Sequence, residues 1–133
     1  MQLLLDRRLR TLLLGLWCLA WLIVAVLMLA PISSPVRVSH ADLIGHFIAF
    51  AALAFGAVGF SRRGTELTLF AAITIAGGMA LELAQGLTPY RTFDILDIAA
   101  NTLGAMTGYA GALTVLLLVI RPAEARQAKG AGA

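Results

Sequence analysis

Four long apolar runs divide this chain of 133 residues and restrict its fold more than any other feature. A helix needs about 20 residues to cross the hydrocarbon core of a bilayer, and backbone groups in lipid must bond within their own segment, which favours helices. The sequence therefore predicts an all-α membrane protein, a four-transmembrane-helix bundle whose neighbouring helices run antiparallel because the connections are short. The predicted spans cover residues 12–30, 43–60, 67–87 and 95–120.

The composition supports one membrane domain and argues against a nucleic-acid-binding protein. Hydrophobic residues make up 60% of the chain and charged residues 13%, against about 25% charged residues in soluble domains. The basic residues lie at the ends of the apolar runs and form no stripe, so we expect no nucleic acid as a partner. We predict that residues 1–125 form the domain and that residues 126–133 are a disordered cytoplasmic tail.

The distribution of lysine and arginine predicts the orientation. If the N-terminus is inside, eight of the ten basic residues lie on the cytoplasmic side, and Arg37 and Arg91 lie outside. Segments rich in lysine and arginine stay in the cytoplasm. Both termini are therefore predicted to be cytoplasmic (N-in/C-in), and the connections after the first and third spans are extracytoplasmic.

Polar residues gather where these apolar runs begin or end. In the predicted topology, all of these positions lie at the extracytoplasmic face. The sequence thus predicts a polar cluster at this face, built from the start of the second run (Asp42 and His46), the end of the third (Glu82 and Gln85), the loop after it (Arg91) and the start of the fourth (Asp94, Asp97 and Asn101).

Helical spacing predicts where these polar side chains point. Asp94, Asp97 and Asn101 are separated by three and four residues, so they share one face of a helix. The same face continues through Gly104 and Gly108, a G-x-x-x-G step. Small residues allow membrane helices to approach closely. We therefore expect the polar cluster to point into the protein, and not into lipid.

Most of these polar residues also have a purely structural explanation. Asp42 can cap the second helix, in the form Ser39-His40-Ala41-Asp42. Glu82 is the hardest to explain in this way, because it is neither a cap nor in a loop, and an ionisable residue inside a membrane suggests function. The remaining structural explanations are a cap of the fourth helix by Thr92 or Asp94, an interhelical hydrogen bond from Asn101, a salt bridge from Arg91 to Glu82, and simple packing for His46.

Three segments of the chain together resemble the VanZ-like family of small bacterial membrane proteins. The resemblance covers residues 42–108, about half the chain, and departs from the family at Leu43, where a lysine often stands at or near this position. It implies a multi-pass protein of the bacterial cytoplasmic membrane. The matching segments are Asp42-Leu-Ile-Gly-His46-Phe, Glu82-Leu-Ala-Gln85 and Arg91-Thr-Phe-Asp94-Ile-Leu-Asp97-Ile-Ala-Ala-Asn101-Thr-Leu-Gly104.

The resemblance and the outer polar cluster together suggest a lipid-related function. The family takes its name from a protein linked to low-level resistance to the glycopeptide teicoplanin, and the resemblance implies a cell-envelope role without specifying a reaction. An outward-facing site suits a phospholipid headgroup or a lipid-linked cell-wall precursor. We assign its ligand-binding residues as Asp42, Gln85, Arg91, Asp94, Asp97 and Asn101.

The charge of the cluster limits which headgroup it can bind. Four carboxylates outnumber Arg37 and Arg91, which leaves a net charge of −2 and would repel a bare phosphate. Either burial keeps a carboxylate protonated, or a divalent cation bridges the carboxylates and the phosphate. Carboxylates together with His46 can hold Mg²⁺, Ca²⁺ or Zn²⁺, and with a cation bound, Glu82 or His46 can serve as a general base.

Two other functions are compatible with the same residues. The cluster can be a non-catalytic network of ion pairs and hydrogen bonds that only locks the second, third and fourth helices together in a scaffold or partner-binding protein. Proton or ion transport is weaker, because no acidic or basic residue occupies the inner half of any span. The sequence leaves open whether the protein is an enzyme, and also its metal dependence and its oligomeric state.

Overall fold

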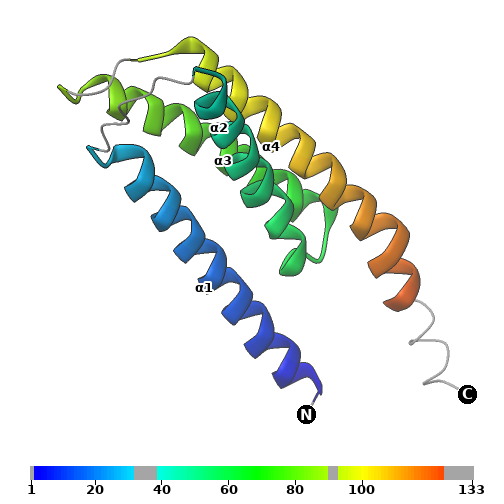
Figure 1. Cartoon of the computed structure of the whole chain (residues 1–133). Helices are drawn as coiled ribbons and strands as arrows, with labels where there is room; N and C mark the ends of the chain where they lie inside the picture. Colours follow the sequence, from blue (N-terminus) through cyan, green and yellow to red (C-terminus); the bar gives the residue numbers. More distant parts are fainter. Residues whose placement is uncertain (1, 32–38, 90–92, 125–133) are drawn as a thin grey trace, which may run out of the picture.

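The computed structural model describes residues 2–31, 39–89 and 93–124, and within these ranges it contains helices and no strands. The helices are arranged as a bundle (Figure 1), and all four are long and apolar enough to cross a membrane, which confirms the predicted fold class. The tail over residues 126–133 lies outside the described residues. The helices are α1 (Gln2–Leu29), α2 (Ser39–Gly56), α3 (Gly64–Gly86) and α4 (Ile95–Val115), with a 3₁₀ turn at Ala57–Gly59 and a π-helical turn at Leu116–Ile120.

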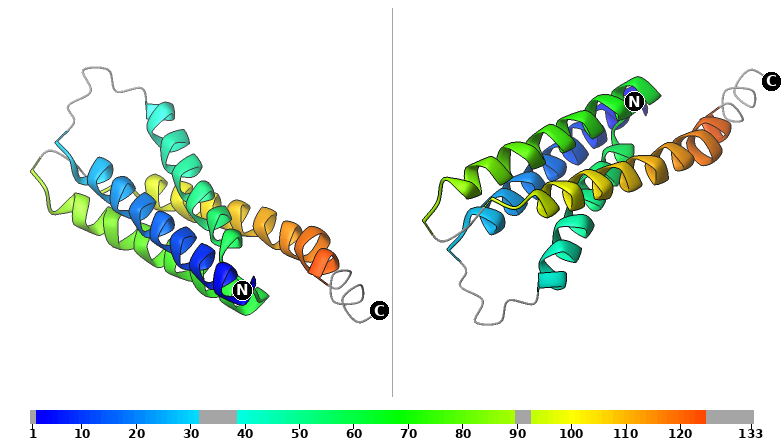
Figure 2. Two further views of the ribbon diagram at one scale, coloured as in Figure 1. Left: turned by 90° about the horizontal axis from the view of Figure 1, so that it is seen from below. Right: turned by 90° about the horizontal axis from the view of Figure 1, so that it is seen from above.

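Helices α2 and α4 form the closest contact in the bundle, and they cross next to the pair formed by α1 and α3 (Figure 2). Gly104 lies against the backbone of Phe47, and Gly108 lies against the backbone of Ala51, so close that an added Cβ atom would overlap the carbonyl oxygen in each case. The G-x-x-x-G step thus lets two main chains touch. This contact holds the starts of both helices side by side.

Helix α1 packs against the rest of the bundle through its tryptophans. The Trp17 ring meets Phe70 of α3 edge-on, with ring centroids 5.3 Å apart, and the Trp17 indole N–H donates to the carbonyl oxygen of Leu53 in α2 over 2.8 Å. Trp21 lies over Gly77 of α3. The Leu53 carbonyl can accept this bond in addition to one within its own helix, because a carbonyl oxygen can accept two hydrogen bonds.

An ion pair joins α1 to α3 at the end of the bundle opposite the polar cluster. Arg10 donates to the Glu66 carboxylate over 3.2 Å, and the same oxygen accepts from the backbone N–H of Arg62 over 2.9 Å. Glu66 lies in the first turn of α3, where a carboxylate also satisfies main-chain donors that have no helical partner. Because this ion pair lies far from the polar cluster, a substitution of Glu66 can serve as a control for substitutions in the cluster.

Cysteine labelling is expected to verify the predicted orientation. Pro89→Cys lies in the exposed turn after α3 and Thr65→Cys at the exposed start of α3, at opposite ends of the same span. In a Cys18→Ala background, an impermeant thiol reagent should label Pro89→Cys and not Thr65→Cys in intact cells, because the positive-inside rule places the α3–α4 connection outside. Labelling of Thr65→Cys alone would reverse the topology.

Candidate functional site

The start of α2, the end of α3 and the start of α4 meet at one end of the bundle (Figure 1). At this end the structure brings together the described members of the predicted polar cluster. Asp42 and Asp94 are exposed, whereas the other members are buried: His46, Glu82, Gln85, Asp97 and Asn101. Burial of so many polar groups inside a membrane bundle demands partners for them.

His46 and Asn101 link α2 to α4 at the centre of the cluster. Nδ1 of His46 lies 3.0 Å from Oδ1 of Asn101. On the other side of the ring, Nε2 lies 3.9 Å from a carboxylate oxygen of Asp42 and 4.0 Å from one of Asp97. The histidine therefore stands between an amide and two carboxylates, and the glycine contacts of α4 set the helix separation that permits this.

Glu82 is fully buried at the end of α3 and uses only one of its two carboxylate oxygens within the described structure. Oε1 accepts from the backbone N–H of Asp94 over 3.2 Å. Oε2 is buried without a hydrogen-bond partner among the described residues. The salt bridge to Arg91 considered from the sequence lies outside the described residues and stays a prediction, as does any ligand contact of Arg91.

Gln85 makes a contact that the sequence did not reveal. Its side-chain N–H donates to the carbonyl oxygen of Met28 over 2.7 Å, a bond that joins α3 to α1. Met28 lies in the last turn of α1, where main-chain carbonyls lack a helical donor. The spacing of Glu82 and Gln85 indicated a shared inward face, but no pattern in the apolar first run identified Met28 as the acceptor.

Asp94 caps α4, as one of the structural explanations predicted. Its carboxylate accepts from the backbone N–H of Leu96 over 2.8 Å, and the residue has the extended backbone typical of an N-cap. Its own N–H is the donor to Glu82. Asp94 thus positions Glu82 through the main chain, and its side chain has a sufficient structural role.

Three residues of the cluster can hold a metal ion. Asp42, His46 and Asp97 each present one ligand atom, and these atoms all lie within 4.8 Å of one another. The catalytic roles predicted for Glu82 and His46, and the ligand contacts predicted for Gln85, Asp97 and Asn101, remain predictions.

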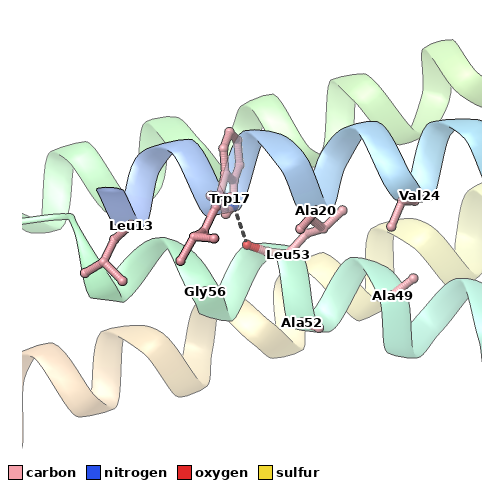
Figure 3. A pocket seen from close by; sticks show the side chains of 9 residues that line it. Leu13, Trp17, Ala20, Val24, Ala49, Ala52, Leu53 and Gly56 are labelled. Atoms are coloured by element: carbon pink, nitrogen blue, oxygen red, sulfur yellow. Dashed lines mark hydrogen bonds between the residues drawn. The ribbon is translucent and has the colours of Figure 1, made fainter. Parts of the chain in front are cut away.

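An apolar groove runs between α1 and α2 (Figure 3), and its first residue on α2, Ala49, follows His46 by three positions. Ala49 and Leu53 form part of its wall, and they follow Asp42 by seven and then four residues, so the three share one face of α2. Gly56 and Gly59 approach Trp17 and Leu13 of α1, whereas Ala51 lies against Gly108 of α4. The groove has a volume of about 320 Å³ and is lined by Leu13, Leu16, Trp17, Ala20, Val24, Ala49, Ala52, Leu53 and Gly56.

Comparison with known proteins identifies the family. Residues 12–119, well over half of the chain, match the VanZ/LLP1 family. A stretch of 43 residues is also 46% identical to the uncharacterised protein C11E3.10 of Schizosaccharomyces pombe, covering 32% of this chain and 26% of the yeast protein. No solved structure matches the chain. The chain therefore belongs to the VanZ/LLP1 family and is a multi-pass membrane protein.

Proposed function

We propose that this VanZ/LLP1 family protein binds the polar headgroup of a membrane lipid at the cluster end, with an acyl chain in the groove between α1 and α2. In a bacterial envelope the lipid would be a phospholipid or a lipid-linked cell-wall precursor. Binding of such a precursor at the extracytoplasmic face would account for an influence on teicoplanin susceptibility.

The unpaired polar atoms of Glu82 and Asn101 carry this proposal. Oε2 of Glu82 and Nδ2 of Asn101 are both buried, and neither has a hydrogen-bond partner among the described residues. Leaving such a group unpaired costs about 1–3 kcal/mol, and more when it is charged. One is an acceptor and the other a donor. A headgroup that offers a hydroxyl or ammonium donor together with phosphate oxygens would satisfy both atoms.

The apolar groove favours a lipid as the ligand over a water-soluble molecule. Its walls are apolar, and it lies on the face of α2 that ends at Asp42. From Ala49 to Gly56 it follows α2 for seven residues, about 10 Å at the helical rise of 1.5 Å per residue. A chain of methylene groups in the groove would place its polar end toward Asp42, so one amphipathic molecule can occupy both regions.

A lipid-binding measurement on Glu82→Gln tests the proposal. Purified protein in lipid nanodiscs would be transferred to detergent, and the lipids that remain bound would be identified and titrated by native mass spectrometry. Loss of a charged hydrogen bond costs roughly 1.5–3 kcal/mol, so Glu82→Gln should weaken lipid binding by about 10-fold to 100-fold. The matched control is Glu66→Gln, which removes a carboxylate at the opposite end of α3 and should bind lipid like the wild type.

A structural scaffold is the second candidate function, and two observed hydrogen bonds favour it. His46 joins α2 to α4 through Asn101, and Gln85 joins α3 to α1 through Met28. In this case the cluster would only hold the bundle together, possessing no lipid site of its own. Equal lipid retention by the wild type, Glu82→Gln and Glu66→Gln would support the scaffold and reject the lipid site.

A further inference from the structure

Three metal-ligating atoms converge at the cluster end of the molecule. They are Nε2 of His46 and one carboxylate oxygen each from Asp42 and Asp97, all within 4.8 Å of one another. His46 and Asp97 are buried, and Asp42 lies at the exposed rim. We infer that these three residues form a binding site for a divalent cation of the zinc class.

The distances suit a bridging cation better than direct hydrogen bonds. Nε2 of His46 lies 3.9 Å from the Asp42 oxygen and 4.0 Å from the Asp97 oxygen, whereas nitrogen–oxygen hydrogen bonds end near about 3.2 Å. Zinc bonds of about 2.0–2.2 Å place tetrahedral ligand atoms about 3.4 Å apart. The Asp42 side chain is 54% exposed and can swing toward the ring, whereas the buried Asp97 carboxylate would have to approach Nε2 by about 0.6 Å to reach this spacing.

Asn101 determines which nitrogen of the His46 ring carries the proton, and a metal needs the other nitrogen to be unprotonated. An amide oxygen only accepts hydrogen bonds, so in the observed orientation Nδ1 of His46 carries the proton and donates to Oδ1 of Asn101. The lone pair of the neutral ring is then on Nε2, which faces the two carboxylates. A metal-binding histidine is commonly oriented by such an acceptor on its other nitrogen. Asn101 is therefore a positioning residue.

Glu82 provides a second and independent observation that points to a cation. It is fully buried at the same end of the bundle, and its Oε2 atom has no partner within the described structure. The arginines that the structure describes lie at the opposite end of the bundle. A buried carboxylate oxygen without a partner favours a positive charge nearby, and a divalent cation held by His46, Asp42 and Asp97 would bring one to this end of the bundle.

The donor set selects the kind of cation. Calcium and magnesium prefer sites made of oxygen ligands alone, whereas imidazole nitrogen suits zinc and neighbouring transition metals. One imidazole and two carboxylates therefore favour Zn²⁺. Three protein ligands leave a fourth coordination position open, as in zinc sites that accept water or a ligand.

The open position suggests how the cation would serve the lipid site, and this step rests on the proposed function. A zinc ion would bring positive charge next to the carboxylates of Asp42 and Asp97, and this positive charge would attract a phosphate. A phosphate oxygen of the headgroup could then complete the coordination. The inference thus narrows the lipid class to headgroups that carry a phosphate.

Metal content and cobalt spectroscopy test the site. The protein would carry a tag without histidine in a Cys18→Ala background, so that neither tag nor thiol binds metal, and it would be stripped with a chelator and reloaded with Zn²⁺ or Co²⁺. The folded protein should retain roughly one ion per chain, and cobalt should give the visible absorption of a four-coordinate site. Glu66→Gln, at the opposite end of α3, should bind metal like the parent protein.

Five substitutions, at the three proposed ligands and at Asn101, connect the metal signal to this site. Asp97→Asn and His46→Gln should abolish binding, and Asp42→Asn should do the same without risk to folding, because Asp42 is exposed. Asn101→Leu should weaken binding by about 10-fold to 100-fold, whereas Asn101→Asp, which keeps an acceptor for Nδ1, should restore it. Absence of bound metal in the folded parent protein, or unchanged binding in Asp42→Asn, would overturn the inference.

Lipid retention by the same metal-free protein separates this inference from the proposed function. Phospholipid that stays bound without metal, in a protein that never takes up Zn²⁺, would overturn the metal site alone. Zn²⁺ that binds as expected, in a protein that retains no lipid, would overturn the lipid site and leave the metal site standing.

Discussion

Replacing Gly108 with alanine is expected to destabilise the protein by about 3 kcal/mol, the upper part of the range for inserting atoms into a packed interior. The new Cβ atom would overlap the carbonyl oxygen and carbon of Ala51. These are backbone atoms of α2, which cannot rotate away as a side chain could. Helices α2 and α4 must therefore separate, and thermal unfolding in detergent should show a clearly lower melting temperature.

Two other glycine substitutions make the test specific to this contact. Gly104→Ala should destabilise similarly, because its Cβ atom would meet the backbone of Phe47. Gly45→Ala is the matched control within α2, since an added Cβ atom there has nothing within 4 Å. If Gly108→Ala and Gly45→Ala melted at the same temperature, the close contact between α2 and α4 would be wrong.

The same glycine contact determines the geometry of the polar cluster. Phe47 faces Gly104 and Ala51 faces Gly108, so α2 and α4 run in the same direction where they cross. One turn before Gly104, this pairing of the two helices places Asn101 beside His46, at the observed 3.0 Å. Any substitution that widens the gap lengthens this bond. We therefore expect Gly104→Ala to reduce metal and lipid binding together with stability.

The sequence was sufficient to predict the four helices and the general position of the cluster, for clear physical reasons. Long apolar runs have few alternatives to membrane-spanning helices. The helical spacing placed Asp97 and Asn101 on the buried face that also carries Gly104 and Gly108. The expectation that Asp94 shares this inward face was wrong, because Asp94 precedes the helix as its N-cap and is exposed. Close packing through the glycine face of α4 and the N-cap role of Asp94 follow from these local patterns, and the structure shows both and identifies α2 as the packing partner.

Contacts of the first helix could not be predicted in the same way. From Leu12 to Leu29, helix α1 is apolar on every side. This part of the sequence therefore has no periodicity that distinguishes an inward face from a lipid-facing one. The acceptor role of the Met28 carbonyl, the Trp17 bond to Leu53 and the groove beside them depend on tertiary packing. Likewise, nothing in the sequence showed that Gly56 of α2 faces Trp17 of α1.

Glu82 and Gln85 are expected to respond in opposite ways to substitution, although they are neighbours on one face of α3. Gln85→Leu should cost about 1–3 kcal/mol of stability, because the Met28 carbonyl would lose its described donor in a water-poor interior. Lipid binding per folded molecule should change little. Melting temperature and lipid retention, measured on the same preparation, would show both effects.

Glu82→Gln should instead leave stability within about 1 kcal/mol of the wild type, or raise it, because the substitution removes a buried negative charge that lacks a full set of partners. The glutamine carbonyl can still accept from the backbone N–H of Asp94, the bond that Glu82 makes through Oε1. Lipid binding should weaken by about 10-fold to 100-fold, as expected where a protein sacrifices stability for function. A structural ion pair would behave differently, since breaking one in a buried setting costs about 3–5 kcal/mol. If Glu82→Gln lowered the melting temperature as much as Gln85→Leu, and lipid retention fell only in proportion, Glu82 would be part of a structural network and no lipid site would remain to be explained.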